Sequence, residues 1–473
     1  MLRLPTSLLL LACGQVSSAA NIHVPKDHAT IQAAIDSAAS GDTILVDAGR
    51  YSERVRLREG ITLRSSGDDS PGQRTLKRAE ETIIDGGGKN GDRPGVAMAE
   101  GSTLDGFTVT NVGVFDEAYW KKHFDTQGEE LGDDEGSTQA EGTVPAVSIR
   151  GANCTVTHNV VHHNGDVGIA IVGVKGHRTA PVVLRNISHR NLGGGIGVAE
   201  QAEPLIRGNT CTENLRAGIG CRNADPQLLD NACTGNVRAG IGCREGSRPL
   251  IRGNTCTHNR RAGIGIRMSG TSPIVEKNIC SNNERAGIGL RDGATAVIRA
   301  NQCLENKLVA IGVTEGCTAT IIGNTLVRTE GGAPPLIGIR DASTATIEAN
   351  TLSGGGVAAV LVQGKAVIAD NSFTGNQSGQ KLAIWVWDNS TATISENSFT
   401  GYATAVKATK ARLVILGNTI SNFRSSGIVV ADSTSPPYIV DNIAVASEPG
   451  ATAVKVTGTS GVVDGNTVKP ARE

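Results

Sequence analysis

The most regular chemistry in this sequence belongs to a short arginine-rich string. Arg-Ala-Gly-Ile-Gly-x-Arg occurs four times, at residues 216–222, 238–244, 261–267 and 285–291. In an extended strand, alternate side chains point to opposite sides. This alternation predicts that both arginines and both glycines of each copy lie outside, while the alanine, the isoleucine and the variable residue lie inside. Four copies in series would build two rows of arginine on one surface.

Such a surface suits a polymer that carries anions. Guanidinium groups pair with carboxylate or sulfate groups, and bare glycines let a ligand approach the backbone closely. Residues 207–299 carry 13 Arg and 1 Lys against 7 acidic residues, which gives a local net charge of +7. We therefore predict an elongated groove for an acidic glycan. Its candidate binding residues are Arg216, Arg222, Arg238, Arg244, Arg261, Arg267, Arg285 and Arg291, with Arg340 continuing the second row after a break at Thr314.

A purely structural interpretation of the arginines stays open. Stacked like charges about 5 Å apart repel each other unless something compensates for them. Acidic neighbours such as Asp225, Glu245 and Asp292 could pair with the arginines. In that case the strings reflect duplication of one stable unit whose arginines are solvated and paired, and no ligand is needed.

Two tryptophans belong to the same predicted surface. Aligning residues 384–394 with residues 337–347 puts Trp385 in the glycine column and Trp387 in the Arg340 column. Exposed indole rings beside guanidinium groups suit the apolar C–H faces of sugar rings. The alternative is that both are ordinary strand residues beneath a loop.

The candidate acid and base residues lie upstream of the arginines. His162 and His189 fall in one outward column, and Asp166 opens the column that later carries Arg216. Histidine titrates near neutrality and a carboxylate can orient it, so these three are the catalytic candidates if the protein is an enzyme. Solvated turn histidines are the alternative. The sequence leaves open whether the protein catalyses a reaction.

The alignment of these residues depends on a repeat. An Asn followed two residues later by an apolar residue or Cys recurs about every 23.6 residues, because 307 residues separate the first copy from the last in 13 steps. Short alternating segments between the copies are broken by Gly and Asn, and none has a helical period. One coil per repeat would pair each strand in parallel with its equivalent in the next turn. The repeated residues are Asn159, Asn186, Asn209, Asn231, Asn254, Asn278, Asn301, Asn324, Asn350, Asn371, Asn397, Asn418, Asn442 and Asn466.

A second Asn column follows the first at a distance of five residues. Asparagine tolerates the left-handed backbone conformation, and its amide can bond to the same amide one turn along. Both columns therefore predict ladders that hold the turns together. The second column contains Asn164, Asn191, Asn214, Asn236, Asn259, Asn283, Asn306 and Asn376.

The cysteines fall in columns whose other members are apolar. Free cysteine behaves as a small buried hydrophobic residue, and neither the odd count nor the spacing suits a disulfide framework or a zinc site. We therefore expect buried packing rather than redox or metal chemistry. The columns hold Cys211, Cys233, Cys256, Cys280 and Cys303 in one case and Cys221 and Cys243 in the other.

The repeat and the segment before it resemble the right-handed parallel β-helix proteins of the pectin-lyase-like superfamily. That segment is Thr30–Asp36, followed by Gly41–Val46 and Gly49–Tyr51. The resemblance covers about residues 22–470. It implies an all-β fold, a single-stranded right-handed parallel β-helix with about 24 residues per turn. Because the superfamily includes lyases, hydrolases, epimerases, adhesins and non-catalytic binders, the resemblance leaves the function open.

The same resemblance implies a short helix that plugs the N-terminal end of the core, with Ile31, Ile35 and Ala38 on one face. We expect a signal peptide at 1–20 and a β-helix domain at 21–473, with the N-terminal cap at about 22–60.

Cys13 follows two leucines and an alanine, as in a bacterial lipobox, so lipid attachment at this residue is an alternative to plain cleavage near Ala20. Either version predicts an exported protein in the periplasm, at the cell surface or outside the cell.

One turn is interrupted by an insertion at about 115–143. It carries nine acidic residues and two lysines, a net charge of −7. Tyr119, Trp120 and Phe124 predict that its first half packs on the coil. Its acidic part could bind calcium, although no EF-hand-like spacing is present, and we expect no other cofactor or metal.

The overall composition limits the classes of molecule that the protein is expected to bind. The chain has 45 basic and 46 acidic residues, so no global field favours nucleic acid. After residue 20 no apolar run approaches the roughly 20 residues that span a bilayer. We predict a monomer that binds an acidic or cell-envelope polysaccharide. The alternatives are a polysaccharide lyase or glycoside hydrolase, and a non-catalytic surface scaffold.

Overall fold

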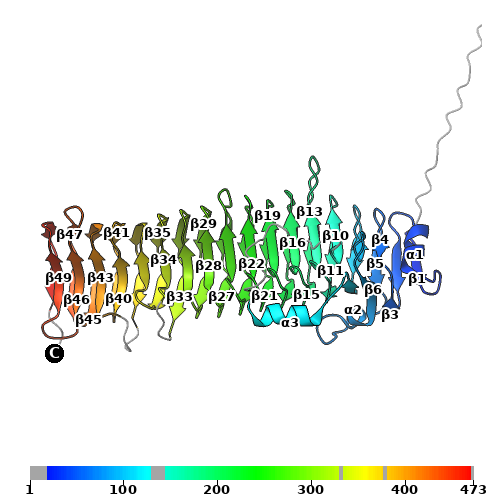
Figure 1. The fold of residues 1–473 in the computed structure, drawn as a ribbon, viewed down its shortest axis with the longest axis horizontal. Coiled ribbons are helices and arrows are strands. Elements are labelled where there is room, and N and C mark those ends of the chain that lie inside the picture. The colour runs from blue at the N-terminus through cyan, green and yellow to red at the C-terminus, as the bar shows by residue number, and fades with distance from the viewer. Residues whose placement is uncertain (1–18, 129–143, 330–333, 376–380, 470–473) are drawn as a thin grey trace, which may run out of the picture.

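The protein is a long coil of parallel β-strands, seen in a computed structural model that describes residues 19–128, 144–329, 334–375 and 381–469 (Figure 1). Within the described residues most turns contribute one short strand to each of three sheets, of which the first has 18 strands and the third has 16. The coil is right-handed with roughly 23 residues per turn. The parallel coil predicted from the repeat and the right-handed β-helix implied by the family resemblance are therefore confirmed.

The three sheets follow one another within every turn. The first sheet runs from β1 (Asn21–Val24) to β50 (Val462–Asp464), and the second from β3 (Gly49–Tyr51) to β51 (Thr467–Lys469). The third sheet consists of β4 (Val55–Arg56), β7 (Val96–Ala97), β10 (Val147–Arg150), β13 (Ile169–Val172), β16 (Ile196–Ala199), β19 (Ile219–Arg222), β22 (Ile241–Arg244), β25 (Ile264–Arg267), β28 (Ala286–Arg291), β31 (Val309–Val313), β34 (Ile337–Ile339), β37 (Val360–Val362), β40 (Leu382–Val386), β43 (Thr404–Thr409), β46 (Ser426–Ala431) and β49 (Thr452–Thr457).

The first Asn column forms a continuous ladder at the turn between the first and second sheets. Each side-chain amide donates to the side-chain oxygen of the next Asn at 2.9–3.0 Å, from Asn159 through Asn466. The second ladder runs from Asn164 to Asn306 at 2.9–3.1 Å, and Asn376 lies outside the described residues. A buried amide without a partner is costly, so these ladders fix the register of successive turns.

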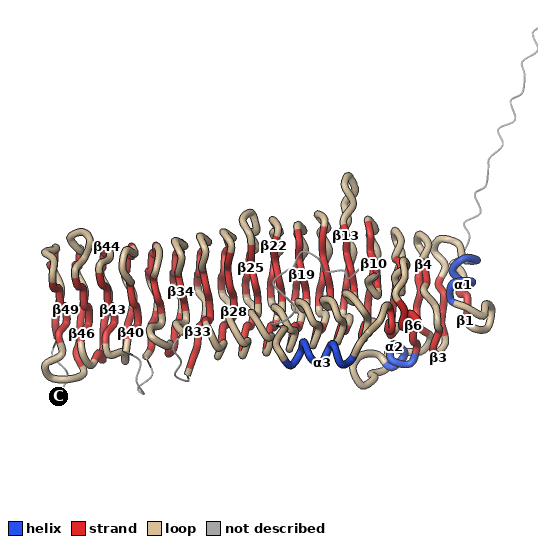
Figure 2. The backbone as a smooth tube through the Cα atoms, in the orientation of Figure 1, coloured by secondary structure: helices blue, strands red, loops and turns tan. Residues whose placement is uncertain are grey.

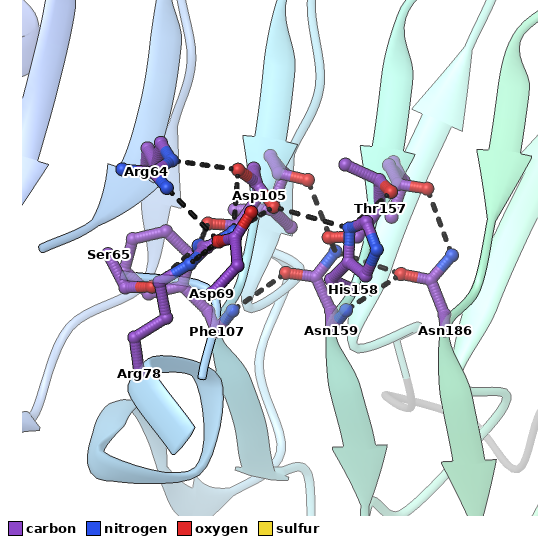
Figure 3. A network of polar contacts seen from close by, with 12 residues as sticks. Arg64, Ser65, Asp69, Arg78, Asp105, Phe107, Thr157, His158, Asn159 and Asn186 are labelled. Carbon is purple, nitrogen blue, oxygen red and sulfur yellow. Dashed lines mark hydrogen bonds and ion pairs between the residues drawn. The ribbon is translucent and has the colours of Figure 1, made fainter. Parts of the chain in front are cut away.

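A buried arginine stands where the first ladder begins (Figure 3). Arg78 donates to both carboxylate oxygens of Asp105 at 2.9 and 3.0 Å, to Asp69 Oδ1 at 2.8 Å and to Ser65 Oγ at 2.9 Å. Arg78 lies in α2 (Lys77–Glu81). The network therefore fastens the loop that carries α2 onto the coil.

The cysteine columns face the core, as predicted. Cys211 pairs in register with Cys233, Cys233 with Cys256, and the column continues through Cys280 and Cys303 to apolar residues. Cys221 and Cys243 are buried in a second column. All nine cysteines within the described residues are buried free thiols.

The N-terminal end is covered by α1 (Ile31–Ser37), as Figures 1 and 2 show. Its Ile31 and Ile35, together with Ala38 just after it, are buried in the main core. The side chain of Thr30 accepts a hydrogen bond from the Ala33 backbone at 3.2 Å and so caps the helix.

The insertion begins with α3 (Glu117–Asp125), which lies along the side of the coil (Figure 1). Trp120 is buried against Leu215 and Val237, and its indole N–H donates to the Glu213 carbonyl oxygen at 2.9 Å. The predicted packing of the first half of the insertion is confirmed for Trp120 and Phe124, whereas Tyr119 is exposed. The later acidic part, from Glu129 to Glu141, lies outside the described residues.

Within the part of the chain that the structure describes, no helix has the length and apolar character needed to cross a bilayer.

Candidate functional site

Seven glycines form one outward column on the third sheet. Parallel pairing in register places each beside the next, so no side chain rises from this strip. All but the last are partly exposed. The column consists of Gly197, Gly220, Gly242, Gly265, Gly289, Gly312 and Gly338.

The other predicted glycine column points inward, which corrects the sequence interpretation. A Cβ on Gly218 would lie 2.8 Å from Asn236 Nδ2 and 2.8 Å from the Gly240 carbonyl oxygen, so only glycine fits there. Ala217, expected inside, is partly exposed and lines the outer surface. The reason is that the chain turns around the second Asn ladder before Ile219, so strict alternation starts only with the strand.

The floor of the site is therefore one glycine column beside one alanine column. A Cβ on Gly242 would lie 3.7 Å from Ala217 Cβ, and one on Gly265 would lie 3.6 Å from Ala239 Cβ. With the arginines on either side, these columns form a groove of about 920 Å³. The groove runs along the coil, and its floor lies close to the backbone because it lacks larger side chains.

The first arginine row forms one wall of this groove. It contains Arg216, Arg238, Arg261 and Arg285, and the backbone N–H of each later member donates to the carbonyl oxygen of the one before at 3.0–3.3 Å. Arg285 is exposed and Arg238 is buried. The backbones of these four arginines thus follow one another at the spacing of the strands, about 4.8 Å.

The second arginine row forms the opposite wall. Arg222 aligns with Arg244 and Arg267 with Arg291, and Arg340 lies two turns further along the groove. The structure thus brings both predicted rows to one surface.

Acidic neighbours compensate the second row, as the structural interpretation expected. Glu245 lies 3.4 Å from Arg244 and 3.7 Å from Arg222, and Arg267 pairs with Asp292 at 2.9 Å. The hydrogen bond from Arg267 lowers the pKa of Asp292. Asp225 instead accepts a bond from the Arg248 backbone at 2.7 Å.

Two further pairs extend this pattern along the row. Arg291 pairs with Glu315 at 3.3 Å, and Arg340 donates to the side-chain oxygen of Gln363 at 2.9 Å. These partly exposed pairs order the row without removing it from the groove.

Helix α3 stands beside the first row. Leu192, Leu215 and Val237 occupy the outward position just before the row and form a strip on which Trp120 packs. The Arg190 guanidinium lies 3.9 Å from the Trp120 ring centroid. Sequence reasoning missed this strip, although an apolar residue recurs after the second-ladder Asn in these three turns.

The tryptophans stand at the far end of the groove. Trp385 pairs with Leu361 in the continuation of the glycine column, and Trp387 continues the column of Arg340. The two indole rings stack with centroids 4.8 Å apart, and Lys407 Nζ lies 5.4 Å from the Trp385 ring centroid. Trp387 is exposed and lines the groove, so the predicted outward orientation is confirmed.

The histidine candidates stack on the second sheet. His162 in β12 (Val160–His162) pairs in register with His189 in β15 (Ile187–His189), and their ring centroids are 4.9 Å apart. His162 Nδ1 lies 2.6 Å from His163 Nδ1, and Arg74 Nη1 lies 3.0 Å from His189 Nε2.

This environment keeps the histidines neutral at neutral pH. Burial, with a smaller contribution from neighbouring positive charge, lowers the pKa of His162 to about 4 and that of His189 to about 3. Asp166 lies on the turn that leads to the third sheet, where it lines the groove one turn before Gly193. The histidines thus project from one sheet while Asp166 belongs to the groove on another.

The described residues hold no group of three or more His, Cys, Asp or Glu side chains arranged for a metal ion. The acidic residues considered for calcium lie mainly in 129–143, which the structure does not describe.

A family model described as the right-handed β-helix region matches residues 172–326 and 335–471. No curated protein matches the chain. Among solved structures, the A-module of the mannuronan C-5 epimerase AlgE6 of Azotobacter vinelandii is 14% identical, with a TM-score of 0.38, over 93% of this chain and 95% of that chain. A PL6 alginate lyase in complex with a trisaccharide is 14% identical, with a TM-score of 0.45, over 81% and 86%. The surface protein and adhesin PfbA of Streptococcus pneumoniae is 12% identical, with a TM-score of 0.29, over 93% and 95%.

Proposed function

This chain belongs to the right-handed β-helix family, and we propose that it binds an acidic polysaccharide along the arginine groove. The observation that carries the proposal is the glycine column of the third sheet, which in four successive turns lies between two rows of arginine. A linear polyanion lying along the coil meets a new pair of guanidinium groups at each turn, about every 4.8 Å.

The floor and the walls suit different parts of such a ligand. Glycine and alanine columns present backbone and methyl groups at which the C–H face of a sugar ring can lie flat. The arginine walls then meet carboxylate or sulfate groups at the ring edges, where a planar guanidinium group forms two parallel hydrogen bonds.

The acidic partners of the second row are compatible with binding. Arg222 lies 3.6–3.7 Å from its acidic neighbours and Arg291 lies 3.3 Å from Glu315, and all of these side chains are partly exposed. Exposed ion pairs of this kind contribute little to stability. A ligand carboxylate can therefore replace Glu315 at Arg291 with little loss of protein stability.

The proposed setting is outside the cytoplasm. The sequence of residues 1–20 predicts a secretory signal, and Cys13 offers lipid attachment as an alternative; both lie mainly outside the described residues. We propose a monomer whose partner is a polysaccharide of the cell envelope or its surroundings.

A binding measurement tests the proposal. Binding constants are measured for polyuronate, sulfated and neutral glycans, with the intact protein and with a variant in which Arg238, Arg261 and Arg285 are Ala. The matched control removes three exposed arginines that do not line the groove: Arg178, Arg207 and Arg412.

We expect the groove variant to lose most of its affinity for acidic glycans, while the control, with the same change in net charge, keeps it. Equal binding by both variants would contradict the proposal. Release of unsaturated or reducing ends from the glycan would instead show an enzyme, and Asp166, His162 and His189 would then be the first residues to replace.

A further inference from the structure

The groove does not end where the arginine strings end, and its second half differs in character. Leu308 takes the position of Arg285 in the next turn, because its backbone N–H donates to the Arg285 carbonyl oxygen at 2.9 Å. Further along the same wall, Pro335 and Val357 line the groove. The wall that is cationic over four turns is therefore apolar over the turns that follow.

The floor and the far end of the groove also become apolar in this half. Leu361 pairs with Gly338 and so fills the glycine column, and Trp385 follows it one turn later. Trp387 closes the groove with an exposed indole. Only the second row stays polar here, with Thr314, Arg340 and Gln363 lining the groove.

The exposure of this apolar half is unusual. Leu308 is 46% exposed, Val357 39% and Trp387 40%, and all three line one continuous groove. Single exposed apolar residues are ordinary, but several around one concave surface mark a site that an apolar partner covers. A hydrocarbon chain covers such side chains without placing hydroxyl groups beside Leu308 and Val357, which cannot accept or donate hydrogen bonds.

We infer that the natural ligand is amphipathic: an anionic glycan that carries an acyl or alkyl chain at one end. This inference rests on the proposed function. The anionic sugars occupy the turns of β19 to β28, and the hydrocarbon chain lies against Leu308, Val357 and Trp387. The two halves belong to one cavity, so a single molecule can fill both.

Three ligands test the cationic half and the apolar half of the groove separately. They are a uronate oligosaccharide with an octyl group at its reducing end, the same oligosaccharide without the octyl group, and octyl glucoside, which has the chain but no charge. Affinities are measured by isothermal titration calorimetry below the critical micelle concentration. Each methylene that leaves water strengthens binding about fourfold, so we expect the octyl oligosaccharide to bind at least tenfold more tightly than the plain one.

Two double variants test which side chains account for the tighter binding of the octyl oligosaccharide. We expect Leu308→Asn combined with Val357→Asn to remove the tenfold advantage of the octyl group while leaving the affinity of the plain oligosaccharide unchanged. Both side chains are exposed, so the coil keeps its core. Thr314→Ala combined with Gln363→Ala, on the opposite wall, is the control and keeps the advantage.

The outcomes distinguish the two proposals. Equal affinities with and without the octyl group would overturn the amphipathic ligand and leave polysaccharide binding intact. If the intact protein bound neither oligosaccharide, both the proposed function and the amphipathic ligand would be overturned. Octyl glucoside binding as tightly as the octyl oligosaccharide would overturn the inference too, because the anionic half would then contribute nothing.

Discussion

Gly263 and Gly265 lie two residues apart in one turn, and their missing side chains face opposite environments. A Cβ on Gly263 would lie 2.7 Å from the Gly287 carbonyl oxygen and 2.8 Å from Asn283 Nδ2, inside the coil. A Cβ on Gly265 would lie 3.6 Å from Ala239 Cβ, which is an ordinary contact on the groove floor. One glycine thus serves the packing of the coil, and the other shapes the groove.

This relationship makes a matched pair of substitutions informative. We expect Gly263→Ala to destabilise the protein by about 2 kcal/mol, because the methyl group overpacks the second Asn ladder. Gly265→Ala should leave stability within about 0.5 kcal/mol of the parent, since the site has room. Urea unfolding followed by circular dichroism measures both.

The same pair tests the groove. Gly265→Ala raises a methyl group from the floor, so we expect it to weaken binding of an acidic glycan although the fold is intact. Gly240→Ala and Gly242→Ala repeat the comparison one turn earlier, where the corresponding closest distances are 2.8 and 3.7 Å. Equal stability losses within either pair would contradict the assigned orientations.

The Asn ladder predicts that replacing an Asn by Ala lowers the stability of the protein by an amount that depends on its place in the ladder. Asn254 donates to Asn278 Oδ1 at 3.0 Å and to the Leu228 carbonyl oxygen at 2.8 Å, and accepts from Asn231 Nδ2 at 2.9 Å. Asn254→Ala leaves several buried polar groups without partners, so we expect a loss of at least about 3 kcal/mol.

The comparison variant is Asn466→Ala, at the last rung of the ladder. Its side chain is less buried, and the change leaves fewer groups unsatisfied, so we expect a loss below about 1.5 kcal/mol. Unfolding midpoints of the two variants, measured side by side, check the difference; a larger loss at Asn466 would show that the ladder does not carry the stability.

Most of the fold was predictable because the coil has a fixed period. Once the repeat aligned Cys211 with Cys233 and Trp387 with Arg340, any residue could be assigned to a column without knowing the path of the chain. The short helix at Ile31–Ser37 was predictable from its resemblance to a known cap.

Most of the orientations that failed lie in the turns, and in the fourth copy Ala286 and Gly287 lie at the very start of β28. Alternation holds from Ile219 onward, but Ala217 and Gly218 belong to the bend around Asn214 and Asn236, where the backbone no longer alternates. A period detects which residues share a column. It does not say which way a turn residue points.

The walls of the site were only partly predictable. The arginine rows could be assigned, but the docking of Trp120 on Leu215 and Val237 depends on how an insertion folds back over other turns. The separation of Asp166 from His162 depends in the same way on a turn between two sheets. Local patterns carry no information about either.

The docking of α3 can be tested by removing Trp120. Trp120→Ala loses the packing on Leu215 and Val237, the bond to the Glu213 carbonyl oxygen and the stacking with Arg190. We expect faster amide exchange in residues 117–125, with protection unchanged in β19 and β22, because the helix detaches while the coil persists. Tyr119→Ala, at an exposed position of the same helix, should not accelerate exchange, and a similar effect from both would contradict the docking role.

The stacked histidines predict how stability depends on pH. His162 and His189 have folded-state pKa values of about 4 and about 3, lowered by burial from an ordinary value of 6.5. Between pH 6.5 and these values the unfolded chain binds protons that the folded protein does not, so acid favours unfolding. For His162 alone the loss is roughly 3 kcal/mol across this interval.

The charged groups around the pair lower its pKa values. His163, Arg74, Arg50 and Arg190 act in this direction on His162, and Glu117 raises only the pKa of the neighbouring His163. Replacing His162 and His189 by Gln removes the titration of these two residues, while that of His163 remains, and keeps polar side chains in their place. We therefore expect the double variant to lose less stability than the parent between pH 6.5 and 4, as measured by urea unfolding at a series of pH values.

The control is His258→Gln, at an exposed position, whose stability should depend on pH in the same way as that of the parent. Parallel curves for the double variant and the parent would show that the stacked pair becomes protonated without cost, contrary to its burial.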